Sequence, residues 1–308
     1  MNPRLVTRVR ELLEQETFDA IYAHHYEGLL VATIARRRAK VRTPIVFDSH
    51  TLLGSELSCY FPHFLGGPVT WLGRILDSQL IHYADAVIGV TDEITNFYAS
   101  RGKLDLPILT ATNGVEYEKF IRALTAGDNV SSVRIVFAGN LSGYQGFDLL
   151  IAAFRKIRQK RQDIELMVAA PETDAVLASM GIENPHDEGI LLYPGGFSEL
   201  PRILASADIA VNPRTVCPGI PQKLLNYMAA ALPTVSFEGS STVLVHEQTG
   251  LIVPNGDIDG FAAAIMRLAD ASELRLRLGS AARTLVETEH NWEQVAVTFE
   301  RVISMLQQ

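Results

Sequence analysis

The sequence predicts an α/β protein with two doubly wound domains, each built on a parallel sheet. Short apolar runs recur along the chain, and segments with helical spacing separate them, which is the pattern of strand–helix–strand units with right-handed crossovers. The length of 308 residues is enough for two domains of about 150 residues each. We therefore expect one sheet in each half of the chain.

Composition excludes several classes of protein. Hydrophobic residues make up 47% of the chain, which is typical of a packed globular protein and excludes disorder. The net charge of −8 gives no sign of a nucleic-acid binder. The two cysteines, Cys59 and Cys217, lack metal-ligand spacing, and no apolar run reaches the roughly 18 residues of a membrane span. We expect a cytoplasmic protein, either free or bound at the inner membrane surface.

The first half contains four predicted strands after an amphipathic helix over residues 3–16. The strands are Phe18–Ala23, Pro44–Asp48, Asp85–Val90 and Leu106–Ala111. A second helix over Glu27–Ala39 ends in a basic cluster that suits a helix carboxyl end. Residues 117–132 lack a clear pattern and read as a linker between the domains.

The second half repeats the alternation more regularly. The predicted strands are Val133–Ala138, Ile164–Ala169, Ile190–Tyr193, Ile209–Asn212, Thr234–Phe237 and Leu251–Val253. A helix is predicted over Phe147–Arg161, and two amphipathic helices over Glu273–Val286 and Asn291–Leu306 close the chain.

The best candidate site lies between the strands that end at Asn212 and begin at Thr234. Pro218, Gly219 and Pro221 form a turn, and a helix follows from Gln222 to Ala231. The helix start offers free backbone N–H groups, and Lys223 and Arg214 add positive charge, a combination that favours phosphate. The alternatives are a solvated Lys223 and an Arg214 paired with an acidic residue.

A glycine-containing loop, 139–146, follows the first strand of the second domain. Its position makes Gly139, Asn140, Gln145 and Gly146 candidates for contact with a diphosphate. The alternative is a turn that only shortens a strand–helix connection, because a lone glycine-rich turn is a weak motif.

The segment after Gly219 resembles the nucleotide-sugar signature of the retaining GT-B glycosyltransferases, known as glycosyl transferases group 1. The resemblance lies in three stretches: Gly219-Ile220-Pro221, Asn226-Tyr227-Met228-Ala229 and Leu232-Pro233-Thr234-Val235. In the first half, the Asp48-x-His50 sequence, the run 84–91 and Asn113-Gly114-Val115-Glu116 are similar to the same family. The resemblance implies two Rossmann-like domains.

The family normally opens with a strand, a glycine-rich loop and further βα units before these motifs. We therefore expect a truncated, acceptor-side domain over 1–124 and a nucleotide-sugar domain over 125–290, with a last helix over 291–308 packing back toward the first domain. An incomplete first sheet would leave an apolar edge that suits a protein partner.

Two departures from the family pattern affect the charges. The family's acidic pair is replaced by Pro218 and Asn226, although an asparagine oxygen still accepts hydrogen bonds from ribose hydroxyls. The family's Arg and Lys of the glycine loop correspond to Asn140 and Gln145. Arg214 and Lys223 would then supply most of the charge that binds a diphosphate.

Histidines follow two strands of the first half. The resemblance implies that His50 lies near the reacting sugar as the catalytic candidate, while a capped loop histidine is the alternative. His24 and His25 end another strand, and two adjacent strand residues point in opposite directions, so at most one of them would face the site. Glu56 is a further candidate on the acceptor side.

The resemblance implies a glycosyltransferase that moves a sugar from a nucleotide-sugar donor to a hydroxyl of a glycan or lipid-linked acceptor, with retention. We identify no Asp-x-Asp pair that would form a metal site, so we expect no metal and no cofactor beyond the donor. The alternative is a catalytically inactive relative that acts as a partner or regulatory subunit. Aromatic residues over 59–76 fit a core, an acceptor surface or a peripheral membrane contact.

Overall fold

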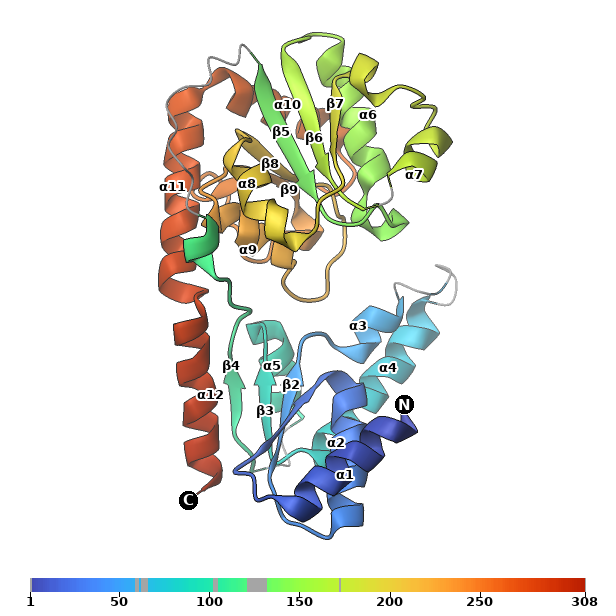
Figure 1. The fold of residues 1–308 in the computed structure, drawn as a ribbon, viewed down its shortest axis with the longest axis vertical. Helices are drawn as coiled ribbons and strands as arrows, with labels where there is room; N and C mark the ends of the chain where they lie inside the picture. The colour runs from blue at the N-terminus through green and yellow to red at the C-terminus, as the bar shows by residue number, and fades with distance from the viewer. Residues whose placement is uncertain are drawn as a thin grey trace. The chain divides into compact units, whose positions relative to one another are not determined.

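The protein divides into two compact units in a computed structural model that describes residues 2–58, 61, 66–101, 105–120, 132–171 and 173–307. The first unit comprises Met1–Asn113, Pro218–Ile220 and Glu293–Gln308, and the second comprises Gly114–Cys217 and Pro221–Trp292. Each unit contains one parallel sheet (Figure 1). The predicted class, α/β with two Rossmann-like domains, is confirmed.

The sheet of the first unit has the four strands that the sequence predicted, in the order β1-β2-β3-β4. Their bounds are β1 Ile21–His24, β2 Ile45–Ser49, β3 Ala86–Gly89 and β4 Ile108–Thr110. All pairs are parallel, and the register aligns His24 with Asp48. The carboxyl ends of β1 and β2 therefore present their polar side chains next to each other.

Alternating side chains of the first sheet belong to two cores. Phe47 and Val87 pack with residues of α2 (His25–Ala39) and α5 (Asp92–Ala99). Val46 and Ile88 point to the other face, where Val302 of α12 (Trp292–Leu306) packs. This division follows from the two-residue period of a strand. The remaining helices of the unit are α1 (Pro3–Gln15), which packs on α2, α3 (Leu53–Ser58) and α4 (Gly66–Leu80).

The sheet of the second unit has six parallel strands in the order β10-β9-β8-β5-β6-β7. Their bounds are β5 Val133–Ala138, β6 Ile164–Ala169, β7 Ile190–Tyr193, β8 Ile209–Asn212, β9 Thr234–Phe237 and β10 Gly250–Val253. The strand order changes direction between β5 and β8, which is the topological switch point where doubly wound sheets bind ligands.

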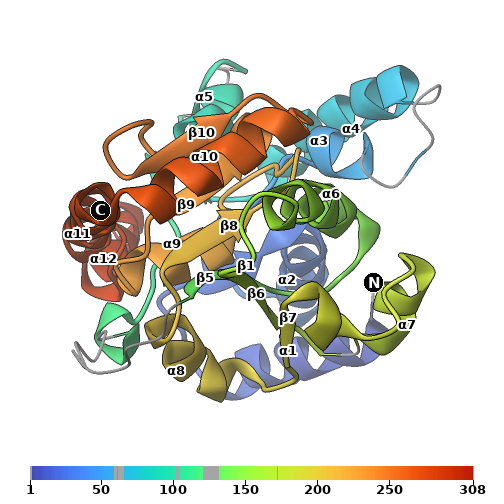
Figure 2. The same ribbon diagram turned by 90° about the horizontal axis from the view of Figure 1, so that it is seen from above.

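Helices cover both faces of the second sheet. α6 and α10 lie on one face, where Phe147 and Phe261 join a core with Phe137, and α8 and α9 lie on the other (Figure 2). The bounds are α6 Phe147–Arg158, α7 Asp174–Ser179, α8 Leu200–Ala205, α9 Gln222–Ala229, α10 Ile258–Asp270 and α11 Ser272–Glu289.

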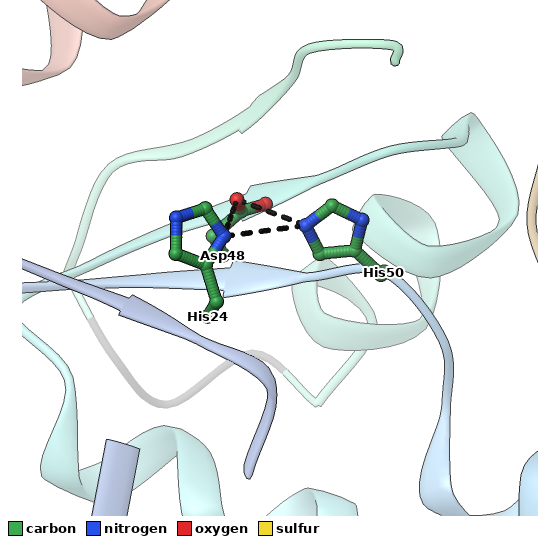
Figure 3. A group of neighbouring side chains, drawn as sticks. All are labelled: His24, Asp48 and His50. Carbon is green, nitrogen blue, oxygen red and sulfur yellow. Dashed lines mark hydrogen bonds and ion pairs between the residues drawn. The ribbon is translucent and has the colours of Figure 1, made fainter. Parts of the chain in front are cut away.

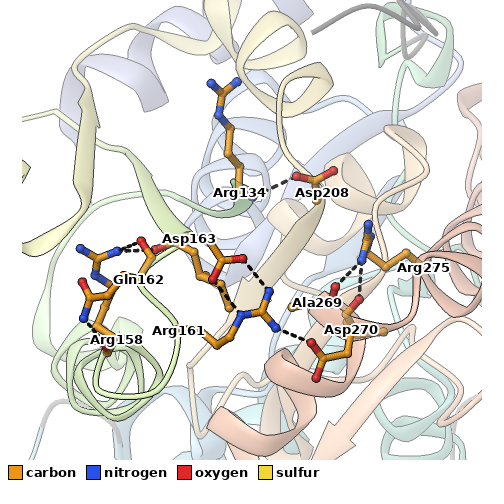
Figure 4. Close-up of polar contacts among 11 residues, drawn as sticks. Arg134, Arg158, Arg161, Gln162, Asp163, Asp208, Ala269, Asp270 and Arg275 are labelled. Carbon is orange, nitrogen blue, oxygen red and sulfur yellow. Dashed lines mark hydrogen bonds and ion pairs between the residues drawn. The ribbon is translucent and has the colours of Figure 1, made fainter. Parts of the chain in front are cut away.

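Charged residues near the amino ends of the second sheet's strands are paired with each other or with the backbone (Figure 4). Arg161 bonds the carboxylates of Asp163 and Asp270, and this pairing holds the pKa of Asp163 below its usual value. Asp208 Oδ2 accepts a hydrogen bond of 2.9 Å from the Arg134 backbone N–H. These charged groups are paired locally, so the edge of the sheet at the amino ends of its strands is not a candidate site.

None of the helices in the described ranges combines the length and the apolar character that crossing a membrane would require.

Candidate functional site

The switch point of the second sheet brings together the two loops that the sequence singled out. The loop 139–146 follows β5, the loop 213–221 follows β8, and β5 and β8 are neighbours. Gly146 has φ +69°, and a Cβ there would lie 2.1 Å from the Pro213 carbonyl oxygen. Only glycine allows this approach, so the two loops are in direct backbone contact.

Lys223 extends from the first turn of α9 into the glycine loop. Its Nζ donates to the Gln145 Oε1 at 2.7 Å and lies 4.3 Å from the centroid of the Phe137 ring. Gly139, with φ +139°, leaves room for this ammonium, since a Cβ at that position would lie 3.3 Å from Nζ. The structure thus places a cation beside the position where the resembling family has a loop lysine.

The ammonium of Lys223 is held in an unfavourable environment. Burial is the main cause that lowers its pKa to about 7, and the positive charge of Arg214 lowers it further. Within the described part of the chain, neither Lys223 nor Arg214 forms an ion pair with a carboxylate. An anion bound here would supply the missing negative charge.

Arg214 is anchored by its backbone neighbours. Its Nε donates to the Val216 carbonyl oxygen at 2.6 Å, its guanidinium lies 4.9 Å from the centroid of the Tyr144 ring, and the Ser240 hydroxyl donates to its carbonyl oxygen. The predicted alternative of an acidic partner is not found among the described residues. Arg214 therefore links the loop 213–221 to the glycine loop, and Lys223 links α9 to the same glycine loop.

The side chain of Asn140 forms its hydrogen bonds within the glycine loop and not with Lys223. Its side-chain amide donates to the Tyr144 hydroxyl at 3.2 Å, and its Oδ1 accepts from the Ser142 N–H at 3.1 Å. Asn140 therefore shapes the loop, and its hydrogen bond is the main cause that lowers the pKa of Tyr144.

Asn226 lies on α9 one turn beyond Lys223 and is buried. Its Oδ1 has no hydrogen-bond partner within the described part of the chain. An unsatisfied buried acceptor is costly, and a ribose hydroxyl is the kind of donor that the family resemblance implies here.

The turn into α9 consists of Gly219, Ile220 and Pro221. Gly219 has φ +132°, a region that favours glycine, and Pro221 provides the cap position of the helix with φ −65°. The Asp257-Ile258-Asp259 sequence is an Asp-x-Asp pair, but both of its carboxylates have partners within the protein. Asp257 caps α10, and Asp259 forms an ion pair with Lys156.

In the first unit, His50 belongs to a cluster with His24 and Asp48 (Figure 3). His24 Nδ1 and His50 Nε2 lie 2.8 Å and 3.0 Å from the same oxygen, Asp48 Oδ2, and 3.4 Å from each other. Asp48 comes from β2 and His24 from the adjacent end of β1. The Asp48-x-His50 spacing is visible in the sequence, where a role was predicted only for His50.

The expectation that His24 and His25 point in opposite directions along a strand is wrong. β1 ends at His24, and His25 begins α2 with φ 56°, so the chain turns between them. As a result the His25 ring also reaches His50, with centroids 4.9 Å apart. Burial, with a smaller contribution from His50, lowers the pKa of His25.

The other candidates of the first unit are Glu56 and the aromatic residues of the stretch 59–76. Glu56 accepts a hydrogen bond of 2.7 Å from the Thr51 hydroxyl. On α4, Trp71 and Leu72 are 67% and 51% exposed, which leaves the acceptor-surface and membrane interpretations open and excludes a core role for Trp71. Cys59 and Phe64 lie outside the described residues.

Family models match both halves of the chain. The model described as "Glycosyl transferases group 1" matches residues 132–271, and the model described as "Glycosyl transferase 4-like domain" matches residues 1–105. Together they cover β1, β2 and β3 of the first sheet, the whole second sheet and every candidate site residue named above.

Two curated relatives illustrate the sequence similarity. The amylovoran biosynthesis glycosyltransferase AmsK of Erwinia amylovora is 29% identical over 204 residues, which are 61% of this chain and 49% of AmsK. A D-inositol 3-phosphate glycosyltransferase of Kribbella flavida is 25% identical over 326 residues, covering 96% of this chain and 73% of the relative.

Solved structures share the fold. The Anabaena protein Alr3699/HepE, in complex with UDP and glucose, superimposes with a TM-score of 0.76 at 16% identity, over 98% of this chain and 81% of its own. Sucrose-phosphate synthase from Thermosynechococcus elongatus gives 0.78 at 17% identity, over 99% and 77%.

Proposed function

Because the chain belongs to the group 1 glycosyltransferases, we propose that it transfers a sugar from a nucleotide-sugar donor to a hydroxyl acceptor, with retention and without a metal ion. The observation that carries this proposal is the position of Lys223, an ammonium without a carboxylate partner in the described structure, in hydrogen-bond contact with the glycine loop. The bond from the anomeric carbon to the diphosphate breaks, the acceptor oxygen bonds to that carbon, and the acceptor proton is released.

The diphosphate is the negatively charged leaving group of this reaction. Lys223, Arg214 and the N–H groups at the start of α9 are the positive groups that would stabilise the charge that develops on it. Buried or half-buried cations act more strongly than solvated ones because the local dielectric constant is lower. The relative HepE, whose solved complexes contain UDP, UDP and glucose, or UDP-glucose, supports a nucleoside diphosphate as the leaving group.

Asn226 and His50 have proposed roles that are separate from the phosphates. The unsatisfied Oδ1 of Asn226 accepts from a ribose hydroxyl. His50 donates to a hydroxyl of the donor sugar, and the Asp48 carboxylate keeps its ring in place. Neither role uses a divalent ion.

The acceptor is a glycan or a lipid-linked hydroxyl. The exposed Trp71 and Leu72 of α4 support an apolar acceptor or a peripheral membrane contact, since aromatic side chains suit the lipid interface.

A calorimetric titration with UDP, together with a panel of sugar nucleotides monitored for released nucleotide, tests the proposal. We expect heat of binding for the wild type and its loss in the Lys223→Met, Arg214→Ala double variant. Lys156→Met, which removes an exposed lysine of the same unit, is the matched control and should bind as the wild type does.

The second candidate function is an inactive relative that acts as a partner subunit. It is favoured by Pro218, Asn140 and Gln145, which replace charged residues of the family. Binding of UDP with no nucleotide released from any donor and acceptor tried would support this candidate, and release of nucleotide would exclude it.

A further inference from the structure

The cluster of His24, Asp48 and His50 has a property that sugar transfer does not require. Two imidazole nitrogens and one carboxylate oxygen from different elements converge on one another, with all three atoms within 4.8 Å (Figure 3). Asp48 is 3% exposed, and its only ionic partners among the described residues are these two histidines.

A buried carboxylate requires a positive partner. Arg and Lys side chains of the described ranges do not pair with Asp48, so its carboxylate faces two imidazole rings and no fixed positive charge. A bound cation would supply that charge. With both histidines neutral, their free ring nitrogens and the carboxylate oxygen are all electron-pair donors aimed at one point.

We propose that His24 Nδ1, Asp48 Oδ2 and His50 Nε2 form a binding site for Zn²⁺. In a tetrahedral zinc site with bonds of 2.0–2.1 Å, neighbouring ligand atoms lie about 3.3 Å apart. The separations here are 2.8, 3.0 and 3.4 Å, so shifts of a few tenths of an ångström complete the geometry. Three protein ligands leave a fourth position for water.

The ligand set selects the type of ion. Imidazole nitrogen suits Zn²⁺ and its first-row neighbours, whereas Mg²⁺ and Ca²⁺ prefer oxygen ligands alone. The side chain of His24 is 63% exposed, so the ion can reach the site from solvent. The turn at His25, with φ 56°, fixes the end of β1 and so the position of the His24 ring.

Zinc binding has a consequence for sugar transfer. A metal on His50 Nε2 takes the place of the direct contact with Asp48 Oδ2 that holds the ring for sugar transfer, so we expect the ion to turn the ring away from the donor sugar and to inhibit the transferase. This consequence rests on the proposed function, whereas the binding of zinc does not.

The test measures binding apart from activity. The chain is titrated with Zn²⁺ by calorimetry, and with Co²⁺ by its visible absorption, which reports tetrahedral nitrogen–oxygen ligation. We expect one ion per chain, and affinity lower by about tenfold or more in His24→Gln and in Asp48→Asn. The matched control is His186→Gln, an exposed histidine of the second unit, which should bind as the wild type does.

Two results would overturn the proposal: no binding by the wild type, or equal affinity in wild type and His24→Gln. In a separate experiment, Zn²⁺ should inhibit nucleotide release by the wild type and by His186→Gln, and should inhibit His24→Gln less, relative to its own metal-free rate. Zinc binding without any transferase activity would refute the proposed function and leave the metal site standing.

Discussion

The ammonium of Lys223 and the side-chain oxygen of Gln145 are 2.7 Å apart, although the two residues are separated by 78 positions in the chain. By the family resemblance, Gln145 stands at the position of a loop cation, and it accepts a hydrogen bond from a cation in the first turn of α9. The positive charge expected in the glycine loop is thus present in space although it is absent from the loop sequence.

Replacement of Lys223 by Met should abolish UDP binding and stabilise the free protein. The half-buried ammonium has no carboxylate partner in the described structure, and burial depresses its pKa, so folding is less favourable with the charge than without it. We expect a gain on the order of 2 kcal/mol in the free energy of unfolding at pH 6. Chemical denaturation and UDP titration of the same variant measure both effects.

The stabilisation by Lys223→Met should shrink as pH rises from 7 toward 10. Lys223 has a folded pKa of about 7, below its unfolded value, so the cost is fully present below pH 7 and disappears as the unfolded lysine also loses its proton. Lys156→Met, at an exposed ion pair, should show no such trend. Equal effects of Lys223→Met at pH 6 and pH 10 would contradict the assignment.

UDP binding should weaken as pH rises above 7. Below that value Lys223 is charged in the free protein, and a bound diphosphate raises its pKa, so binding takes up a proton in the range just above pH 7. We expect affinity to fall by about tenfold between pH 7 and pH 8.5. Calorimetry in buffers with different ionisation enthalpies measures the proton uptake directly. Lys223→Arg, whose guanidinium stays charged, is the control and should show a flatter dependence.

Gly146→Ala should strongly destabilise the second unit. The added Cβ would lie 2.1 Å from the Pro213 carbonyl oxygen at a residue with φ +69°, so both a clash and backbone strain result. We expect a loss of about 2–4 kcal/mol. Gly181→Ala is the matched control, because Gly181 has φ +73° but no atom within 4 Å of the added Cβ, and it should lose only about 1 kcal/mol. Thermal unfolding of the two variants separates the cost of the clash from the cost of the backbone strain. Equal losses of stability in the two variants would show that the loops can move apart.

Buried parallel strands were the most predictable elements. β5, β6, β7, β8 and β9 have the predicted bounds, because strands covered on both faces are continuous apolar runs. β1 was predicted from Phe18, but it starts at Ile21, and Phe18 is 40% exposed. The helix α9 ends at Ala229, before the predicted Ala231, which adopts φ 53°. Strand edges and helix ends depend on such local backbone angles, which apolar spacing does not encode.

The candidate site was predictable in its residues and not in its contacts. Gly139, Gln145 and Lys223 were each named from local motifs, but the hydrogen bond that joins α9 to the glycine loop depends on the pairing of β5 with β8. The cluster at His50 was missed because His24 and His25 were treated as adjacent strand residues and Asp48 was given no role, whereas the chain turns at His25 with a positive φ. The Asp48-x-His50 spacing at the end of β2 was the signal available for it.

Asp48→Asn should lower the rate of transfer and leave UDP affinity unchanged. The amide keeps the size of the side chain but removes the charge that holds the His50 ring, 3.0 Å away, so the ring is less often oriented toward the donor sugar. We expect the turnover number to fall by about 10–100-fold with chelator present, so that no metal contributes. Nucleotide release at saturating donor measures turnover, and calorimetry measures UDP binding. Glu56→Gln is the matched control, since that carboxylate accepts from Thr51 and not from His50. A variant that keeps wild-type turnover would mean that Asp48 does not position His50.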